Sequence, residues 1–256
     1  MDLGLTGRRA LVFGSSSGLG RAVAAGFVAE GADVVVAGRD TGRLEATVAE
    51  IGAVGSVAGD IVETGSVERL VEEAAALLGG LDIVIGNTGG GKPGGLADVS
   101  SDDEDDAYAR MLRPQLRLAR AAAGHLQVRP PGRLVFITAR SILEASPELA
   151  LSSVFRSGVA AAARTLALEL APDVLVNVVV PGQFDTPALE RFQRQTARLE
   201  GVEIDEVRER HRASIPLGRF GSADELAAAV VFLCSTQASY ITGTVVRVDG
   251  GSVIGF

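Results

Sequence analysis

Apolar residues follow two different periods along the chain. Short runs rich in β-branched residues alternate with longer stretches in which apolar residues recur at helical spacing. Strands separated by helix-length segments indicate right-handed crossovers and a parallel sheet with helices on both faces. The pattern therefore predicts a single α/β domain over residues 1–256, built on a Rossmann-like doubly wound sheet of about seven parallel strands. The predicted strands span residues 10–13, 33–37, 54–58, 83–85, 133–138, 175–180 and 244–248.

Polar residues mark where two of the intervening helices begin. The stretch 66–78 has apolar residues at helical spacing, and Thr64 or Ser66 is its expected cap. The acidic run 102–106 follows Ser100, and negative charges are stabilised near the positive end of a helix. We therefore interpret the run as a solvated helix start and expect no metal site.

Composition and charge narrow the classes of protein to consider. With 256 residues and 47% hydrophobic content the chain can bury a substantial core, and its net charge of -8 argues against a nucleic-acid surface. No apolar run approaches the roughly 18 residues of a membrane span, and residues 1–4 lack the basic start of a secretory signal. Cys234 is the only cysteine and lies in an apolar stretch, which favours a buried thiol. We expect a cytoplasmic protein with no membrane and no nucleic-acid partner.

A glycine-rich turn follows the first predicted strand. Residues 14–20 read Gly-Ser-Ser-Ser-Gly-Leu-Gly, and a helical pattern runs over residues 19–30. Backbone amides and the helix N-terminus would face an incoming diphosphate, and glycine is needed where a side chain would block that approach. A plain strand-to-helix turn is the alternative interpretation. The turn lacks the Gly-Lys pair of a Walker loop, which argues against a nucleoside triphosphatase.

The residues after the second predicted strand bear on the choice of cofactor. Arg39 and Asp40 follow this strand directly. An acidic residue at the strand end would accept a hydrogen bond from a ribose 2′-hydroxyl, whereas Arg39 could pair with a 2′-phosphate. We therefore favour NADP(H) over NAD(H). The alternative is that Arg39 is a solvated loop residue and that Asp40 caps the next helix.

Several further segments, together with the glycine-rich turn, make the chain resemble the short-chain dehydrogenase/reductase family over nearly its full length. The matching segments are residues 14–20, 31–36, 60–61, 86–89, 176–177, 181–186, 215–219, 240–243 and 249–251. The resemblance implies an NAD(P)-dependent oxidoreductase with a small-molecule substrate, a substrate lid near residues 187–215, and a homo-oligomer, either a tetramer or a dimer. The cofactor-binding residues that the resemblance and the motifs imply are Gly14, Ser16, Ser17, Gly18, Leu19, Gly20, Arg39, Asp60, Ile61, Asn87, Thr88, Gly89, Arg156, Pro181, Gly182, Phe184 and Thr186.

The four catalytic positions of that family are all substituted in this chain. The resemblance places Ser152 at the tyrosine, Arg156 at the lysine, Ala139 at the serine and Met111 at the asparagine. The enoyl-reductase variant of the motif fails as well, because Leu149 stands at its tyrosine position. The active site is therefore expected to be atypical.

These substitutions change the chemistry that the cleft can perform. A phenol has a reference pKa near 10, and an aliphatic hydroxyl is a far weaker acid, so Ser152 cannot simply replace tyrosine as a proton donor. Arg156 can hold the cofactor ribose, but an arginine cannot exchange a proton near neutral pH. Arg140, Ser141 and His211 are the nearest candidate replacements, and a structural role is the alternative for each. We take Ser152, Arg156 and Ser141 as the candidate catalytic residues.

Three functions follow from this combination of a matching cofactor site and a substituted catalytic site. The first is an NADP(H)-dependent oxidoreductase that acts on a small carbonyl or alcohol without the usual Tyr/Lys pair, and the family resemblance favours it. The others are a non-redox lyase, isomerase or cyclase on the same scaffold, and a catalytically inactive cofactor-binding protein. Segments 89–95 and 144–156 resemble a divergent branch, similar to 3-oxoacyl-[acyl-carrier-protein] reductases, that has serine and arginine at the tyrosine and lysine positions.

Overall fold

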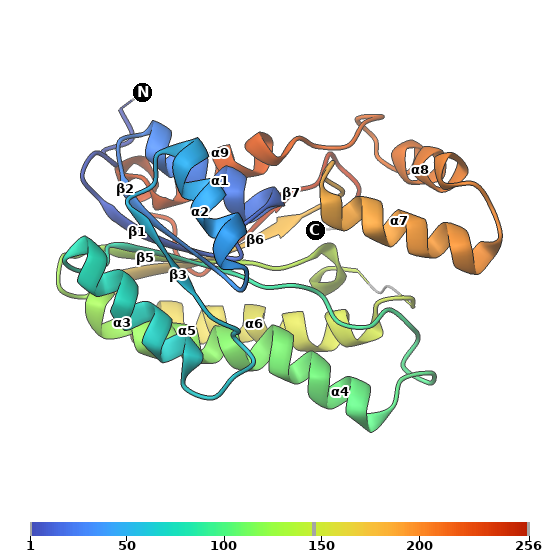
Figure 1. Cartoon of the computed structure of the whole chain (residues 1–256), viewed down its shortest axis with the longest axis horizontal. Coiled ribbons are helices and arrows are strands. Elements are labelled where there is room, and N and C mark those ends of the chain that lie inside the picture. The colour runs from blue at the N-terminus through green and yellow to red at the C-terminus, as the bar shows by residue number, and fades with distance from the viewer. Residues whose placement is uncertain (1, 145–146, 255–256) are drawn as a thin grey trace.

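One parallel sheet organises the computed structural model, which describes residues 2–144 and 147–254 (Figure 1). Within these ranges seven strands lie in the order β3-β2-β1-β4-β5-β6-β7, so the winding direction reverses between β1 and β4. This confirms the predicted Rossmann-like α/β fold with about seven parallel strands. The strands are β1 (Arg9–Phe13), β2 (Asp33–Gly38), β3 (Gly55–Ala58), β4 (Ile83–Asn87), β5 (Gly132–Ile137), β6 (Val174–Pro181) and β7 (Val245–Val248).

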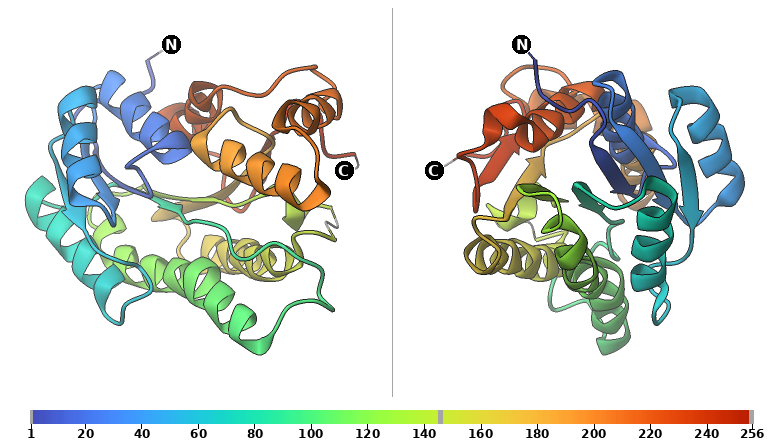
Figure 2. Two further views of the ribbon diagram at one scale, coloured as in Figure 1. Left: turned by 45° about the vertical axis from the view of Figure 1, so that its right-hand side comes forward. Right: turned by 90° about the vertical axis from the view of Figure 1, so that its left-hand side faces the viewer.

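Helices cover both faces of the sheet (Figures 1 and 2). Helices α1, α2 and α9 lie on one face, and α3, α5 and α6 lie on the other. Helices α7 and α8 extend beyond the sheet, on the side where the strands end (Figure 1). The helices are α1 (Gly18–Ala29), α2 (Thr41–Ile51), α3 (Ser66–Leu78), α4 (Ser101–Ala107), α5 (Arg113–Leu126), α6 (Ala150–Glu169), α7 (Pro187–Glu200), α8 (Ile204–Ala213) and α9 (Ala223–Cys234).

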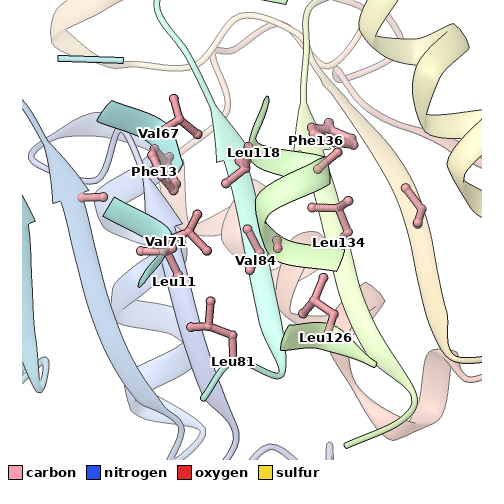
Figure 3. Close-up of a cluster of buried hydrophobic side chains, with 14 of the residues drawn as sticks. Leu11, Phe13, Val67, Val71, Leu81, Val84, Leu118, Leu126, Leu134 and Phe136 are labelled. Atoms are coloured by element: carbon pink, nitrogen blue, oxygen red, sulfur yellow. The ribbon is translucent and has the colours of Figure 1, made fainter. Parts of the chain in front are cut away.

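Side chains that alternate along the strands build a core on each face of the sheet. Leu11 and Phe13 of β1 point into the layer formed with α3 and α5, where they join Phe136 of β5 (Figure 3). Val12 points to the opposite face and packs in the cluster that contains Phe27 of α1. Both faces are thus buried, which is why the strands are apolar throughout rather than alternating with polar residues.

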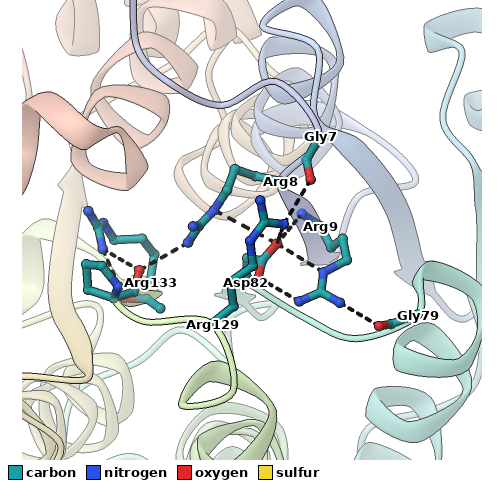
Figure 4. Close-up of polar contacts among 9 residues, drawn as sticks. Gly7, Arg8, Arg9, Gly79, Asp82, Arg129 and Arg133 are labelled. Atoms are coloured by element: carbon teal, nitrogen blue, oxygen red, sulfur yellow. Dashed lines mark hydrogen bonds and ion pairs between the residues drawn. The ribbon is translucent and has the colours of Figure 1, made fainter.

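A buried carboxylate ties together the chain segments at the amino-terminal edge of the sheet (Figure 4). Asp82, which is fully buried, accepts hydrogen bonds from Arg9 Nη2 at 2.7 Å, Arg9 Nε at 3.0 Å and the Arg9 backbone nitrogen at 3.0 Å. Arg129 and Arg8 lie 3.5 and 3.9 Å from the same carboxylate. Burial alone would raise the pKa of Asp82, but the hydrogen bonds from Arg9 and the charge of Arg8 hold it below its ordinary value.

Several local predictions can be compared with the structure. Helix α3 begins at Ser66, but the expected side-chain cap was wrong: Gly65 occupies the cap position with φ 78°, a conformation that favours glycine. Helix α4 begins with a capping box between Ser100 and Asp103, so the acidic run is a helix start as predicted. Cys234 is buried, and burial raises the pKa of its thiol to about 12. Among the described residues, no helix combines the length and the apolar character needed to cross a membrane.

Candidate functional site

A cleft of about 480 Å³ opens at the carboxyl ends of the strands, where the loops after β1, β2 and β4 meet the start of α7. Ligands of doubly wound sheets bind at this edge, next to the point where the strand order reverses. The structure brings most of the predicted cofactor-binding residues together here. Those that line the cleft are Gly14, Ser16, Ser17, Gly18, Leu19, Arg39, Asp60, Ile61, Asn87, Thr88, Gly89, Arg156, Pro181 and Thr186.

Glycines allow the turn after β1 to fold tightly at the start of α1. Gly14 and Gly18 have positive φ angles of 63° and 55°, a region that side chains rarely adopt. A Cβ atom at Gly20 would lie 2.3 Å from the Gly14 carbonyl oxygen, so this position needs glycine although it does not line the cleft. Ser17, at the cap of α1, makes no side-chain cap hydrogen bond. The first-turn amides therefore meet the cleft without a capping side chain, an arrangement suited to a phosphate.

Ser15 is a residue of this turn whose importance was missed from the sequence. It is fully buried, and its Oγ donates to the Val12 carbonyl oxygen at 2.7 Å and accepts from the Ala37 backbone nitrogen at 3.0 Å. These bonds hold the turn against β2. Nothing in a run of three serines distinguishes the buried one from its half-buried neighbours, Ser16 and Ser17.

Arg39 lies in the cleft wall at the end of β2, with its Nη1 3.9 Å from Asp60 Oδ2. The adjacent carboxylate is directed elsewhere, because Asp40 Oδ1 accepts a hydrogen bond from the Arg43 backbone nitrogen at 3.0 Å. Asp40 thereby caps α2, as one interpretation of the sequence expected. Of the two residues that directly follow β2, Arg39 therefore lines the cleft and Asp40 does not.

Arg156 of α6 anchors the loop after β4. Its side chain is buried, with the residue only 8% exposed, and Nη2 donates to the carbonyl oxygens of Gly89 at 3.0 Å and Thr88 at 3.3 Å. Burial lowers the pKa of Arg156 to about 10, so the guanidinium stays charged at neutral pH. Arg156 Nε and Thr88 Oγ1 are buried without a hydrogen-bond partner among the described residues. Both residues line the cleft, where a polar ligand would satisfy such atoms.

The residues at the other aligned catalytic positions form a different set. Ser152 Oγ lies 3.2 Å from Ser141 Oγ, and either hydroxyl can be the donor. Ala139 offers no polar side chain, and Met111 is fully buried in the π-helical turn between α4 and α5 (Tyr108–Leu112). The structure thus brings two candidate catalytic residues, Ser141 and Ser152, into contact, although neither lines the cleft. The two serines are 11 positions apart in the sequence, and no motif indicated that they would be in contact.

Two further predicted cofactor-binding residues do not line the cleft. A Cβ atom at Gly182 would lie 2.6 Å from the Asp249 Cα atom, so Gly182 serves the close packing of the loop after β6. Phe184 is buried, and its ring packs over Gly221. Both positions shape the loop that leads to α7 rather than offering atoms to the cleft. Residues 145–146 of the segment that resembles the divergent branch lie outside the described residues.

The segment predicted as a substrate lid, residues 187–215, forms α7 and α8. Thr186 Oγ1 caps α7 by accepting a backbone hydrogen bond from three residues further on, at 3.3 Å. The ring of Phe192 stacks on His211 of α8, with 6.0 Å between the ring centroids. Arg191 of α7 lines the cleft and was missed from the sequence. Its position within the first two turns after Thr186 was the available signal.

His211, which the sequence offered as a candidate proton donor, lies on α8 and contacts α7. Its Nδ1 lies 3.4 Å from Gln193 Nε2 on α7. Burial lowers the pKa of His211, and the nearby charges of Arg140 and Arg210 lower it further. The imidazole is therefore neutral near pH 7. Within residues 2–144 and 147–254, no group of three or more His, Cys, Asp or Glu residues is placed to hold a metal ion.

Taken with the strand order, the glycine-rich turn at the start of α1 defines a doubly wound α/β domain with a nucleotide-type cleft at its switch point. Comparison with known sequences narrows this class to one family. Residues 14–253 match the family model described as "Enoyl-(Acyl carrier protein) reductase". The 3-oxoacyl-[acyl-carrier-protein] reductase FabG of Aquifex aeolicus is 32% identical over 257 residues, covering 98% of this chain and 99% of that protein. The chain belongs to the short-chain dehydrogenase/reductase family.

Solved structures show the same similarity in three dimensions. The L-sorbose reductase from Gluconobacter frateurii, complexed with NADPH and L-sorbose, superposes with a TM-score of 0.93 at 28% identity, covering 100% of both chains. The actinorhodin polyketide ketoreductase with NADPH superposes with a TM-score of 0.91 at 27% identity, covering 96% of this chain and 97% of that chain. The similarity therefore extends over the whole sheet and the helices around it.

Proposed function

We propose that this protein is an NADP(H)-dependent oxidoreductase that interconverts a small carbonyl compound and its alcohol. The cleft at the switch point of the sheet carries the proposal, because its glycine-rich turn and Arg39 suit a dinucleotide with a 2′-phosphate. Two similar proteins of known structure contain NADPH, which supports the choice of cofactor.

The residues of the cleft fit the parts of such a cofactor. The amides at the start of α1 are suited to its diphosphate, and Arg39 to its 2′-phosphate. Arg156 Nε and Thr88 Oγ1 lack partners among the described residues and can hydrogen-bond the ribose hydroxyls nearer the reaction centre. When bound, the nicotinamide would supply or accept the hydride.

We assign the substrate oxygen to the Ser152 hydroxyl, which Ser141 contacts. Ser152 does not line the cleft itself, but it lies one turn of α6 before Arg156, which does. If Ser141 donates to Ser152 across their 3.2 Å contact, the Ser152 proton is free to hydrogen-bond a carbonyl oxygen and polarise it. Neither hydroxyl is acidic enough to give up a proton at neutral pH, so in this proposal water supplies it. General acid–base catalysis is worth roughly 10² to 10⁴-fold, and we expect turnover to be slower by a factor in that range than with a tyrosine donor.

Cofactor binding can be measured by titrating the protein with NADPH and with NADH and following the fluorescence of the dinucleotide, because the chain has no tryptophan. We expect tighter binding of NADPH. Arg39→Ala should weaken NADPH binding about tenfold, the value of one charge-assisted contact at a partly exposed site, and leave NADH unchanged. Arg43→Ala, four residues away on an exposed face of α2, is the matched control. Absence of binding to either dinucleotide would contradict the proposal.

Turnover should then be assayed across a panel of ketones, aldehydes and secondary alcohols. Oxidation of NADPH that falls when Ser152 is replaced by alanine is the expected result. Tight binding of NADPH without oxidation of any substrate would instead identify an inactive cofactor-binding protein. Product formation that continues after the cofactor is removed would identify a non-redox enzyme.

A further inference from the structure

Four arginines line the cleft, and three of them are engaged by the protein itself. Arg191, the fourth, is exposed and makes no hydrogen bond or ion pair with any described residue. Among the described residues, Arg191 is therefore the cleft arginine that has no polar contact with the protein. The contacts of the other three are Arg39 with Asp60, Arg110 with Asp106, and Arg156 with the Thr88 and Gly89 carbonyl oxygens.

The start of α7 fixes where this cation lies. Thr186, the cap of α7, has side-chain atoms 3.8 Å from the position that a Cβ atom at Gly18 would occupy. The beginning of α7 is thus in contact distance of the beginning of α1. Ala188 and Arg191 are three residues apart, so they share a face of α7, and both line the cleft.

The start of α1, next to which α7 begins, favours a negatively charged ligand. The first turn of α1 contains no acidic residue, and Ser17 leaves its amides without a side-chain cap. Asp60 is the acidic residue among those that line the cleft, and it lies beside Arg39. An anion at the start of α1 would therefore meet backbone amides on one side and a guanidinium on the other.

We propose that Arg191 binds the diphosphate of the dinucleotide and so makes α7 part of the cofactor site. The proposal rests on the dinucleotide-binding function proposed above and adds a contact from the lid. Closing α7 over the diphosphate would couple the lid to the cofactor rather than to the substrate alone. Because NADPH and NADH share the diphosphate, Arg191 should act on both, in contrast to Arg39.

The test compares Arg191→Ala with Arg194→Ala. Arg194 lies on the same helix, is exposed and pairs with Glu190, so its loss removes equal charge without touching the cleft. Dissociation constants are measured for NADPH and NADH by their fluorescence. ADP-ribose, which carries the diphosphate but no nicotinamide, and adenosine 2′-monophosphate, which lacks the diphosphate, are measured by displacement of NADPH.

We expect Arg191→Ala to weaken NADPH, NADH and ADP-ribose about tenfold, to leave adenosine 2′-monophosphate unchanged, and to flatten the salt dependence of dinucleotide binding. Arg194→Ala should resemble the wild type. Dinucleotide affinities of Arg191→Ala within twofold of Arg194→Ala would overturn the proposal while leaving the proposed function intact. Equal weakening of adenosine 2′-monophosphate would place Arg191 elsewhere in the cleft and also overturn it. A wild-type protein that binds none of the four ligands would refute the proposed function itself.

Discussion

Asp82→Asn removes the charge that Arg8, Arg9 and Arg129 share at the amino-terminal edge of the sheet. Asparagine keeps the shape of the side chain but has one acceptor oxygen, whereas Arg9 donates three hydrogen bonds to two oxygens. At least one of these hydrogen bonds is lost, and the NH2 group of the new asparagine side chain then faces an N–H donor of Arg9. Hydrogen bonds to charged groups are worth about 1.5–3 kcal/mol, and removing one partner of a buried ion pair costs about 3–5 kcal/mol. Because the Arg9 side chain is 17% exposed and can partly rehydrate, we expect a loss of about 3 kcal/mol.

The effect should depend on pH with a definite sign. The folded-state pKa of Asp82 lies below its ordinary value, so its stabilisation is present above about pH 4 and is lost as the pH falls through the folded-state pKa. The stability difference between wild type and Asp82→Asn should therefore shrink in acid. Urea unfolding can be followed by far-ultraviolet circular dichroism at one protein concentration and from pH 7 downwards. It measures the loss of stability at pH 7 and the change of that loss with pH. Glu73→Gln, which breaks an exposed pair with Arg69, is the control, with an expected loss within about 0.5 kcal/mol. A loss below about 1 kcal/mol for Asp82→Asn at pH 7, or a difference independent of pH, would refute this reasoning.

Three further predictions concern the cleft and the core. Gly20→Ala would place a Cβ atom 2.3 Å from a backbone oxygen, so NADPH binding should weaken by more than about tenfold in a fluorescence titration; Gly124→Ala, with nothing within 4 Å, should bind normally. Ser141→Ala should lower kcat about tenfold without changing the affinity for NADPH, whereas Ser153→Ala, whose hydroxyl bonds its own helix, should leave kcat unchanged. Cys234, with a pKa of about 12, should resist a thiol reagent at pH 8 until urea unfolds the protein, and rapid labelling of the native protein would contradict its burial.

The sheet could be predicted from the sequence because its strands are buried on both faces and therefore read as apolar runs. The predicted fourth strand ended at Ile85, two residues early, since Gly86 and Asn87 interrupt the run. In the structure both still pair with β5, because the ladder needs backbone groups and not apolar side chains. The lateral order of the strands was not predicted, because apolar runs do not indicate which strands are neighbours.

The site was less predictable, because its contacts join residues far apart in the chain. No motif marked the cleft arginine on α7, and nothing in the sequence indicated that Ser141 would contact Ser152. Three of the hydrogen bonds that Asp82 accepts come from Arg9, 73 positions away. A lone acidic residue before an apolar strand gives no indication of that partner. Motifs located the turn that can hold a phosphate, but only the folded chain showed which other residues line the cleft around that turn.

The two edges of the parallel sheet carry different features of this molecule. The arginine cluster around Asp82 joins strands where they begin, while the cleft opens where they end. Ala139 and Ser152 lie at this second edge, in the loop after β5 and in the first turn of α6, away from the cluster around Asp82. Substitutions that alter the cleft therefore need not disturb the hydrogen bonds of Asp82, so the chemistry of the cleft and the stability of the sheet can change independently.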